Sequence, residues 1–451
     1  MDRDDYVNKR SEYYHEIKKA KRKTWKSFVE KADERTIWTL KKYMDSVPIP
    51  RHIRTINNAT SNEDKAAAFK STFFPPPPSA DLSDIPSSYP DPAPCNSKIT
   101  TRQLENAINK LSPNKAPGPD EISNLVLKKT FHIIKNHLLA LMQATININH
   151  FPTPFKTTTT VVLRKPSKPD YTKPNAYRPI ALENTLGKVL ESIMAELLNY
   201  ITETHQLLPP EHFGGRPGRT AEDAMTILSE RIQHAWKEKE VYSAVFMDVA
   251  GAFNNVHHER LIDNMKRRRI PGFIIAWTES FLRDRSTSLR FNGITSEEIR
   301  TEAGVPQGSP LSPILYMYYN AELLDVPRTS EERTVQSLGF IDDIAYGVQG
   351  QNDEDNTRKL QKMLQRAEEW RKKHGAKFET TKYILIHFTR NKHRKADSSV
   401  TIANVTIQPS CEARYLGVIF DKNLRFKQHL QYVAKKGTKF ALAISRITKA
   451  T

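Results

Sequence analysis

The sequence predicts an α+β fold with more than one lobe, because helical and extended patterns both recur along its 451 residues, and that length exceeds one compact domain. Residues 6 to 45 contain neither proline nor glycine and indicate one or two basic helices. Ser97 to Leu111 carries a helix start signal followed by apolar residues at helical spacing. Short apolar runs that end at aspartates predict strands, two of which would form an antiparallel hairpin around Asp342 and Asp343.

The charge balance indicates a polyanionic partner. Lysine and arginine outnumber aspartate and glutamate by 69 to 51, which gives a formal net charge of +18. Such an excess favours nucleic acid, because each phosphate that is neutralised releases condensed counterions. A merely basic soluble protein is the alternative that charge alone leaves open.

Cysteine content and hydropathy limit the compartment. Cys95 and Cys411 are too few for a disulfide scaffold or a Cys-rich zinc knuckle, so a reducing compartment fits. The amino terminus has no apolar signal region, and no stretch approaches the 18 or more apolar residues of a membrane span. We therefore expect an intracellular protein with no membrane partner.

The first hundred residues are expected to form a basic connector over 1–60 and a proline-rich linker over 61–98. The run PPPPSADLSDIPSSYPDPAP cannot continue a helix or a central strand, so the folded core is expected to begin after it. In the connector, cations alternate with aromatic residues, a pattern that suits a nucleic-acid backbone. Packing of those aromatics on the protein body is the alternative. The candidate nucleic-acid contacts there are Lys18, Lys19, Lys23 and Lys26.

Three aspartates are the strongest chemical signal. The apolar run Ala244 to Met247 predicts a buried strand that delivers Asp248 at its end. In SLGFIDDIAYGVQ, two apolar strands flank Asp342 and Asp343, which places these carboxylates at a hairpin tip. Each signal alone is also typical of an ordinary cap or turn. Together they describe hard oxygen ligands that could hold two Mg²⁺ ions, with Mn²⁺ as an alternative, for phosphoryl transfer.

Two further segments suggest contacts to a nucleotide. EAGVPQGSPLSPILY combines glycines that permit close backbone approach with prolines that stiffen a turn, and it contains Gln307 and Gly308. A plain turn leading into a helix is the other interpretation. Around a strand pair, Lys165 and Arg178 belong to a cationic cluster that could clamp a triphosphate or form a solvated surface.

These segments, in their order, resemble the palm motifs of reverse transcriptases, and the wording resembles the non-LTR (LINE-type) retrotransposon subclass. The resemblance extends roughly from Ile99 to Thr451. It rests on FMDVAGAF, GVPQGSPLSP and FIDD, supported by NKAPGPDEI, YRPIALENTLGKVLE, FGGRPGRTAEDA, FETTKYILIHFTR and YLGVIFD.

The resemblance implies a right-hand polymerase fold with fingers, an antiparallel palm sheet and a partial thumb. It implies a reverse transcriptase domain over about 145–421, divided into a fingers-side region 99–235, a palm 236–400, and a palm end and thumb start over 401–451. It also implies an RNA template, a DNA primer, dNTP substrates and a nuclear location, with an endonuclease region that is separate or missing.

Residue roles follow from the same resemblance. Asp248, Asp342 and Asp343 fall on the metal-binding carboxylates, and Val249 joins them in the metal site. Phe253 falls on the residue that guards the sugar 2′ position. The remaining implied contacts are Gln307, Gly308, Arg178 and Lys165 for the nucleotide, Lys382 as general acid for pyrophosphate, and Arg216 and Arg219 for nucleic acid.

Departures and alternatives remain at this stage. Asn254, Glu121 and Gly215 differ from the residues common in the family, but all three lie outside the carboxylate set. An RNA-dependent RNA polymerase would share the carboxylates, yet Phe253 argues against it. A group II intron maturase, or an inactive RNA-binding relic of such an element, is a further interpretation.

Overall fold

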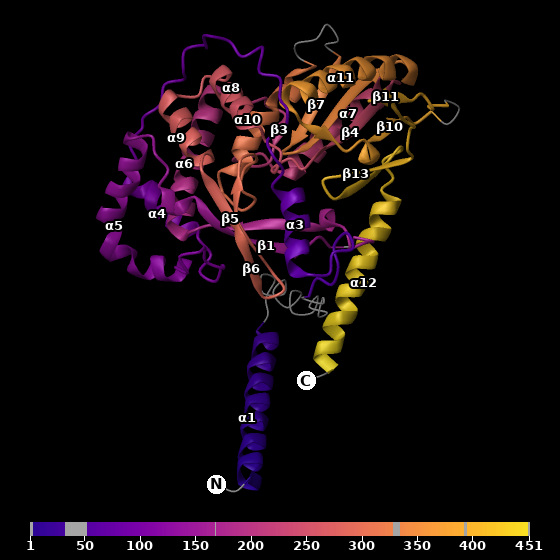
Figure 1. Cartoon of the computed structure of the whole chain (residues 1–451). Coiled ribbons are helices and arrows are strands. Elements are labelled where there is room, and N and C mark those ends of the chain that lie inside the picture. The colour runs from indigo at the N-terminus through magenta and orange to yellow at the C-terminus, as the bar shows by residue number, and fades with distance from the viewer. Residues whose placement is uncertain (1–2, 32–51, 167, 328–333, 392–394, 450–451) are drawn as a thin grey trace. The chain divides into compact units, whose positions relative to one another are not determined.

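The computed structural model describes residues 3–31, 52–166, 168–327, 334–391 and 395–449. The chain divides into two units, a large one spanning His52–Arg425 and a small one made of the residues on both sides of it. In the small unit, α1 (Arg3–Glu30) and α12 (Lys427–Lys449) are helices (Figure 1). The expected basic N-terminal helix is therefore present as far as Glu30, and the part of the prediction beyond residue 31 lies outside the described residues.

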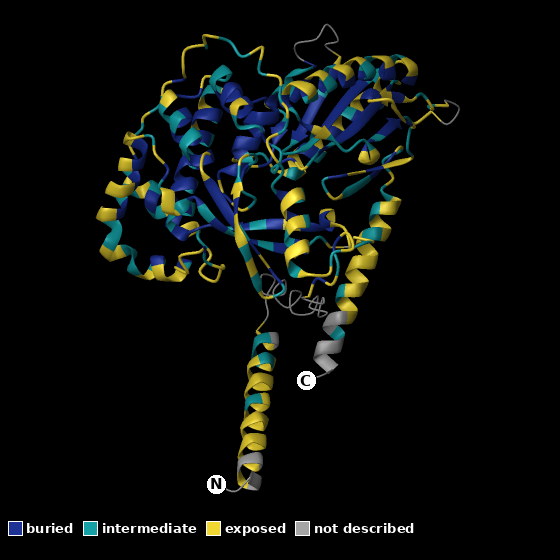
Figure 2. Ribbon diagram, in the orientation of Figure 1, coloured by how far each residue is buried: buried dark blue, intermediate teal, exposed yellow. Residues whose placement is uncertain are grey.

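The palm sheet has the strand order β10-β4-β8-β7-β3, and β9 also pairs with β4. All pairings are antiparallel except β3 with β7. The apolar run that predicted a buried strand is β4, whose first seven residues are buried beneath α7 and α11 (Figure 2). These elements are β3 (His212–Phe213), β4 (Val241–Ala250), β7 (Val335–Phe340), β8 (Asp343–Gly350), β9 (Lys377–Phe378), β10 (Ile384–Phe388), α7 (Ala221–Lys237) and α11 (Asp353–His374).

A second sheet has the order β2-β1-β5-β6, with β1 and β5 parallel and the other pairs antiparallel. Its strands are β1 (Thr157–Arg164), β2 (Tyr177–Leu182), β5 (Arg285–Phe291) and β6 (Ile294–Thr301). Hydroxyl groups join β1 to β5 in the buried interior, where the Thr160 and Thr287 Oγ1 atoms lie 2.7 Å apart. This sheet carries the cationic strand pair that the sequence indicated.

Six further helices of the large unit share one continuous apolar core with the palm sheet. The helix expected near Ser97 to Leu111 begins after a capping box in which Thr100 and Gln103 satisfy each other's backbone amides. From Val400 onward the chain forms two short hairpins. The helices are α4 (Thr101–Lys110), α5 (Asn124–Asn147), α6 (Thr185–His205), α8 (His258–Arg267), α9 (Gly272–Leu282) and α10 (Ser312–Asp325), and the hairpins join β11 (Val400–Ile402) to β12 (Val405–Ile407) and β13 (Glu412–Tyr415) to β14 (Val418–Asp421).

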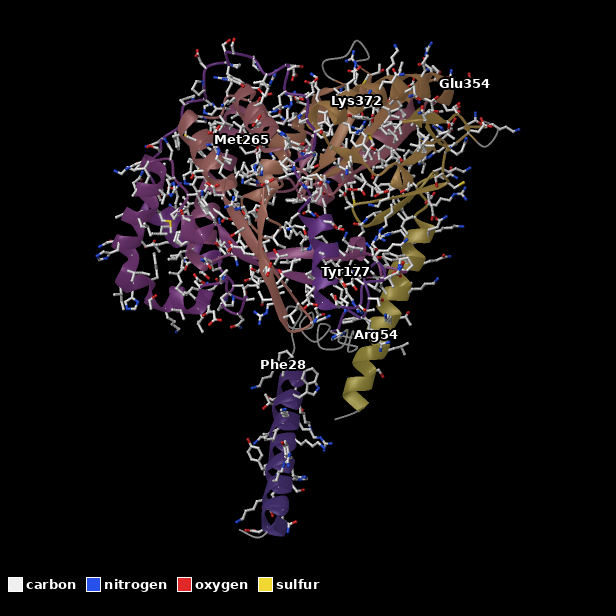
Figure 3. All side chains as sticks on the ribbon, viewed as in Figure 1. Phe28, Arg54, Tyr177, Met265, Glu354 and Lys372 are labelled. Carbon is white, nitrogen blue, oxygen red and sulfur yellow. The ribbon has the colours of Figure 1, made fainter. Side chains whose placement is uncertain are left out.

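The expectation that the folded core begins after a linker over 61–98 is wrong. Residues 62–73 form α3 (Asn62–Phe73), and Phe69 is fully buried against Phe73, Tyr177 and Phe291. Tyr177 is labelled in Figure 3 beside this helix. Two of these aromatic partners, Tyr177 and Phe291, come from distant parts of the sequence, so local composition did not show the packing.

The proline-rich run is extended, as predicted, but it is fixed to the large unit as a strap. Arg260, with 2% of its side chain exposed, pairs with both Asp84 and Asp263, and Lys373 Nζ lies 2.8 Å from Asp84 Oδ2. Burial would raise the pKa of Asp84, but hydrogen bonds from Lys373 and Arg260 lower it to about 2. Further along, the Ala93 amide donates to the Arg269 carbonyl. The strap therefore connects α3 to α4 across α8 and α11.

Candidate active site

The two carboxylate segments meet in the palm sheet. β4 and β8 are adjacent and antiparallel, and Asp248 lies directly opposite Asp343 in their register. Directly opposed residues have Cβ atoms about 4.5–5.5 Å apart. Ile341 and Asp342 form the two-residue turn that joins β7 to β8, and Asp343 is the first residue of β8. All three aspartates are partly exposed. The predicted hairpin is confirmed, and the strand register places the two carboxylate segments side by side.

The turn itself is conformationally strained. Ile341 has a φ of +54°, which is unfavourable for a β-branched residue. Its backbone is held on both sides, because its amide donates to the Phe213 carbonyl and its carbonyl accepts from Asn320 Nδ2 at 2.7 Å. Neighbouring structure thus fixes the orientation of Asp342.

The electrostatics of the three aspartates favour a bound cation. Burial, and then repulsion from Asp342 and Asp248, raises the pKa of Asp343 to about 7. Burial and the charge of Asp248 also raise the pKa of Asp342. One ammonium group opposes these carboxylates, with Lys382 Nζ 2.5 Å from Asp248 Oδ2.

The three aspartates supply the type of ligand atom that divalent ions bind, although they do not form a closed metal-binding group. Carboxylate oxygens are the ligands that Mg²⁺ prefers, and like charges this close are stabilised when a cation lies between them. Within the residues that the structure describes, however, no three carboxylate, histidine or cysteine side chains are arranged closely enough to form a metal-binding group.

In chelator-treated protein, the wild type should lose stability as the pH rises from 5 to 8. The Asp343→Asn variant should lose less over the same range. The raised pKa means that Asp343 favours folding while it is protonated, and that this contribution is lost as pH rises from about 4 through about 7. Asparagine does not titrate, so the variant should melt at least about 2 °C above the wild type at pH 8. Thermal unfolding at both pH values measures this.

The effect of Mg²⁺ completes that prediction. Added Mg²⁺ should raise the melting temperature of the wild type at pH 8, because a ligand that binds the folded state stabilises it, and it should raise that of Asp343→Asn less. If the melting temperatures of the wild type and Asp343→Asn depend on pH in the same way in chelator, the pKa of Asp343 is not raised in the folded protein.

The loop 304–309 packs between the first carboxylate segment and β2. The Val305 amide donates to the Phe253 carbonyl at 2.7 Å, and the Ala181 amide donates to the Gln307 carbonyl at 2.8 Å. Gly304 and Gly308 both have positive φ, and a Cβ on Gly308 would collide with the Ala181 backbone. The close approach that the glycines suggested is therefore made to the protein's own backbone, and Gln307 Oε1 is buried with no hydrogen-bond partner in the described residues.

Phe253 is partly buried and stacks on Tyr316, with ring centroids 5.3 Å apart and an interplanar angle of 19°. The sequence analysis missed Tyr316, which lies in α10 and is fully buried. Its hydroxyl has no hydrogen-bond partner in the described part of the chain, and burial and the charge of Asp342 raise its pKa well above the usual value. Tyr316 is one of three tyrosines in α10, and the sequence gives no local signal of which of them lies at the site.

Lys165 and Lys382 lie within electrostatic reach of Asp248, and Arg178 lies within reach of Lys165. Burial lowers the pKa of Lys165, and the charges of Lys168, Arg178 and Lys382 lower it further, while Asp248 raises it. Cations that repel one another in this way create a positive potential that an anionic group would relieve. The structure thus brings together Lys165, Arg178 and Lys382, which come from separate sequence segments.

Arg216 requires a correction. It was expected to contact nucleic acid, but 2% of its side chain is exposed, and its guanidinium pairs with Glu203 at 2.6 Å. It also donates to the Pro209 and His212 carbonyls. A buried guanidinium with these partners holds the loop together and is not free for phosphate. Arg219, in the same loop, contacts the Pro210 carbonyl and the Phe213 ring.

The four N-terminal lysines are exposed on α1, in the small unit.

None of the described helices is long and apolar enough to span a membrane.

Comparison with known proteins identifies the family. The family model described as "Reverse transcriptase (RNA-dependent DNA polymerase)" matches residues 163–420. The chain is 30% identical over 340 residues to the probable RNA-directed DNA polymerase from transposon BS of Drosophila melanogaster, covering 75% of this chain and 37% of that protein. It is 28% identical over 334 residues to the RNA-directed DNA polymerase from mobile element jockey of Drosophila funebris, covering 74% and 36%.

A solved structure, apo telomerase from Candida tropicalis truncated from the C-terminal domain, aligns with a TM-score of 0.41 and 15% identity, covering 66% of this chain and 60% of that one. Because the family model covers more than half of the sequence, the chain belongs to the reverse transcriptase family. Its relatives place it with the reverse transcriptases of non-LTR retrotransposons, as the motifs predicted. The chain spans less than two fifths of the length of these two relatives.

Proposed function

We propose that this chain is an RNA-directed DNA polymerase that extends a DNA primer along an RNA template with dNTPs. The observation that carries the proposal is the pairing of Asp248 with Asp343 across adjacent strands, with Asp342 in the adjoining turn. Carboxylates in this arrangement, facing cations on the fingers side, suit metal-assisted transfer of a nucleotidyl group.

The metal site would comprise the three aspartates and the backbone of Val249, which continues β4 beyond Asp248. Two Mg²⁺ ions, or Mn²⁺ in their place, would activate the primer 3′-hydroxyl and neutralise the triphosphate when bound. The family supports a general dependence on divalent metal, and the identity and number of the ions are part of the proposal.

The protein's own groups would bind and orient the nucleotide. Arg178 and Lys165 would hold the triphosphate, because a guanidinium can grip phosphate oxygens in pairs. Gln307 and Gly308 would contact the nucleotide through the loop 304–309, and Phe253 would lie against the sugar. Lys382, now paired with Asp248, would be released as metal binds and could then give a proton to the departing pyrophosphate.

In this proposal, 99–235 serves as the fingers side, 236–400 as the palm, and 401–451 as the palm end and the start of the thumb. The relatives extend well beyond the matched region. We therefore assign any endonuclease activity to a separate region, and we place the reaction in the nucleus, where a DNA primer would be found.

The test is primer extension on an RNA template with purified protein, four dNTPs and Mg²⁺. We expect products that are complementary to the RNA and that end at its 5′ terminus. Bound but unextended primer on every template would contradict the proposal. A matched reaction with a DNA template measures the preference for RNA.

The α1 lysines give a separate prediction. Replacing Lys18, Lys19, Lys23 and Lys26 together by alanine should weaken RNA binding and make the salt dependence of affinity shallower, because each phosphate contact contributes about 0.7–0.9 to the slope of log K against log salt. Fluorescence anisotropy between about 50 and 200 mM salt measures the slope. Four exposed lysines elsewhere on the chain, replaced in the same way, serve as the control, and an equal effect from both sets would remove α1 as a specific contact.

A further inference from the structure

A buried chain of polar groups joins α6 to the loop 304–309. Glu183 and Glu191 are fully buried, and Arg285 is 5% exposed. Arg285 Nη2 donates to Glu183 Oε1 at 3.3 Å. At the other end, Ser309 Oγ donates to Glu191 Oε2 at 2.5 Å and accepts from the Leu311 amide at 3.1 Å. These polar groups therefore link Arg285, the first residue of β5, to Leu311, the residue before α10.

The two remaining carboxyl oxygens have no donor in the described residues. These are Glu183 Oε2 and Glu191 Oε1. Two ionised carboxylates beside one guanidinium would leave an uncompensated buried negative charge, which is costly. The Glu183 and Glu191 carboxyl groups lie within hydrogen-bonding reach of each other, so one proton shared between them would leave a single negative charge, which balances the charge of Arg285.

The electrostatics agree with this arrangement. Burial and then the charge of Glu183 raise the pKa of Glu191 well above its usual value, although Arg285 and the Ser309 hydroxyl act in the opposite direction. Burial likewise raises the pKa of Glu183, although Arg285 and Lys188 lower it. A carboxyl group kept neutral by such surroundings can donate as well as accept hydrogen bonds.

We propose that Glu191 is a protonated positioning residue that shares its proton with Glu183 and fixes Ser309, thereby setting where the Gln307–Gly308 backbone meets the incoming nucleotide. This inference rests on the proposed function. Backbone hydrogen bonds to Phe253 and Ala181 hold the rest of the loop. Ser309 connects the loop to Glu191 on the buried face of α6. Freeing that connection would let the nucleotide-binding face of the loop shift, and small displacements at a reaction centre are costly.

The closest variants separate this role from simple packing. Glu191→Gln stays neutral, and its amide can donate to Glu183 while its oxygen accepts from Ser309. Glu191→Ala leaves both partners without it, and Ser309→Ala removes the contact from the loop side. Glu196→Ala is the matched control, because Glu196 lies on the same helix but forms an exposed pair with Lys110.

The experiment measures kcat and KM for the dNTP by single-nucleotide primer extension, together with thermal unfolding of each protein. Glu191→Ala and Ser309→Ala should raise the KM for the dNTP about tenfold and change kcat far less, since they remove nucleotide positioning. Glu191→Gln and Glu196→Ala should stay within about twofold of the wild type on the same scale. If both alanine variants melt at a lower temperature but keep the wild-type KM, the network serves only to stabilise the fold. If Glu191→Gln is as impaired as Glu191→Ala, Glu191 does not act as a neutral carboxylic acid.

Amide hydrogen exchange provides a measurement that does not depend on activity. Residues 304–311 should exchange faster in Glu191→Ala than in the wild type, and at the wild-type rate in Glu191→Gln. If the wild type fails to extend a primer while this exchange pattern holds, the proposed function fails and the link between α6 and the loop stands. Unchanged exchange in Glu191→Ala would overturn the positioning role itself.

Discussion

Asp342→Asn should reduce nucleotide addition by about a thousandfold or more, because it removes a carboxylate from the centre that neutralises developing charge. Binding of a primer–template duplex should change little, since the basic residues that would contact the duplex are untouched. The aspartate belongs to a turn whose backbone is held by Phe213 and Asn320, so the fold should survive the substitution.

The measurement for Asp342→Asn combines the rate of single-nucleotide addition with the Kd for the duplex. Asp91→Asn, which changes an exposed carboxylate on the strap, is the control and should extend normally. A variant that retains more than about a tenth of the wild-type rate would remove Asp342 from the metal site.

Phe253→Ala should lower the preference for dGTP over GTP by about tenfold to a hundredfold, since a cavity in a recognition pocket changes discrimination on this scale. The side chain is partly buried and stacks on Tyr316, so part of it is available to meet a sugar. Loss of the stack should cost about 1 kcal/mol of stability, less than the roughly 3–5 kcal/mol expected for a fully buried phenylalanine. The measurement is the ratio of kcat/KM for dGTP to that for GTP.

Phe273→Ala is the matched control for sugar selection, because Phe273 is also partly buried against the same core but lies on α9. Its ratio should equal that of the wild type. If Phe253→Ala slows both nucleotides equally, Phe253 is a core residue, and the polymerase would select its substrate by another contact.

Local patterns in the sequence predicted the parts of the site that depend on neighbours along the chain. The apolar run before Asp248 and the paired runs around Asp342 and Asp343 are typical of buried strands, and the structure has β4, β7 and β8 there. The capping box at Thr100 likewise marked the start of α4.

The features that the sequence did not predict depend on contacts between distant residues. The strap resembled a free linker because prolines exclude helix and strand, while its attachment depends on Arg260, a residue more than 170 positions away. Arg216 was assigned to nucleic acid from the family resemblance, whereas its guanidinium pairs with Glu203 on α6, an element outside the motif. Tyr316 and Glu191 each lie in a helix with other polar residues, so their roles depend on what the fold places opposite them.

The most direct test of the metal site is to count ions by Mn²⁺ titration, followed by electron paramagnetic resonance, of the protein bound to a chain-terminated primer, an RNA template and a dNTP. The site predicts two tightly bound Mn²⁺ ions per wild-type complex, and fewer in a variant that carries Asp248→Asn and Asp342→Asn together. The same number of tightly bound ions in the wild type and the double variant would contradict the assignment of these carboxylates as the metal ligands.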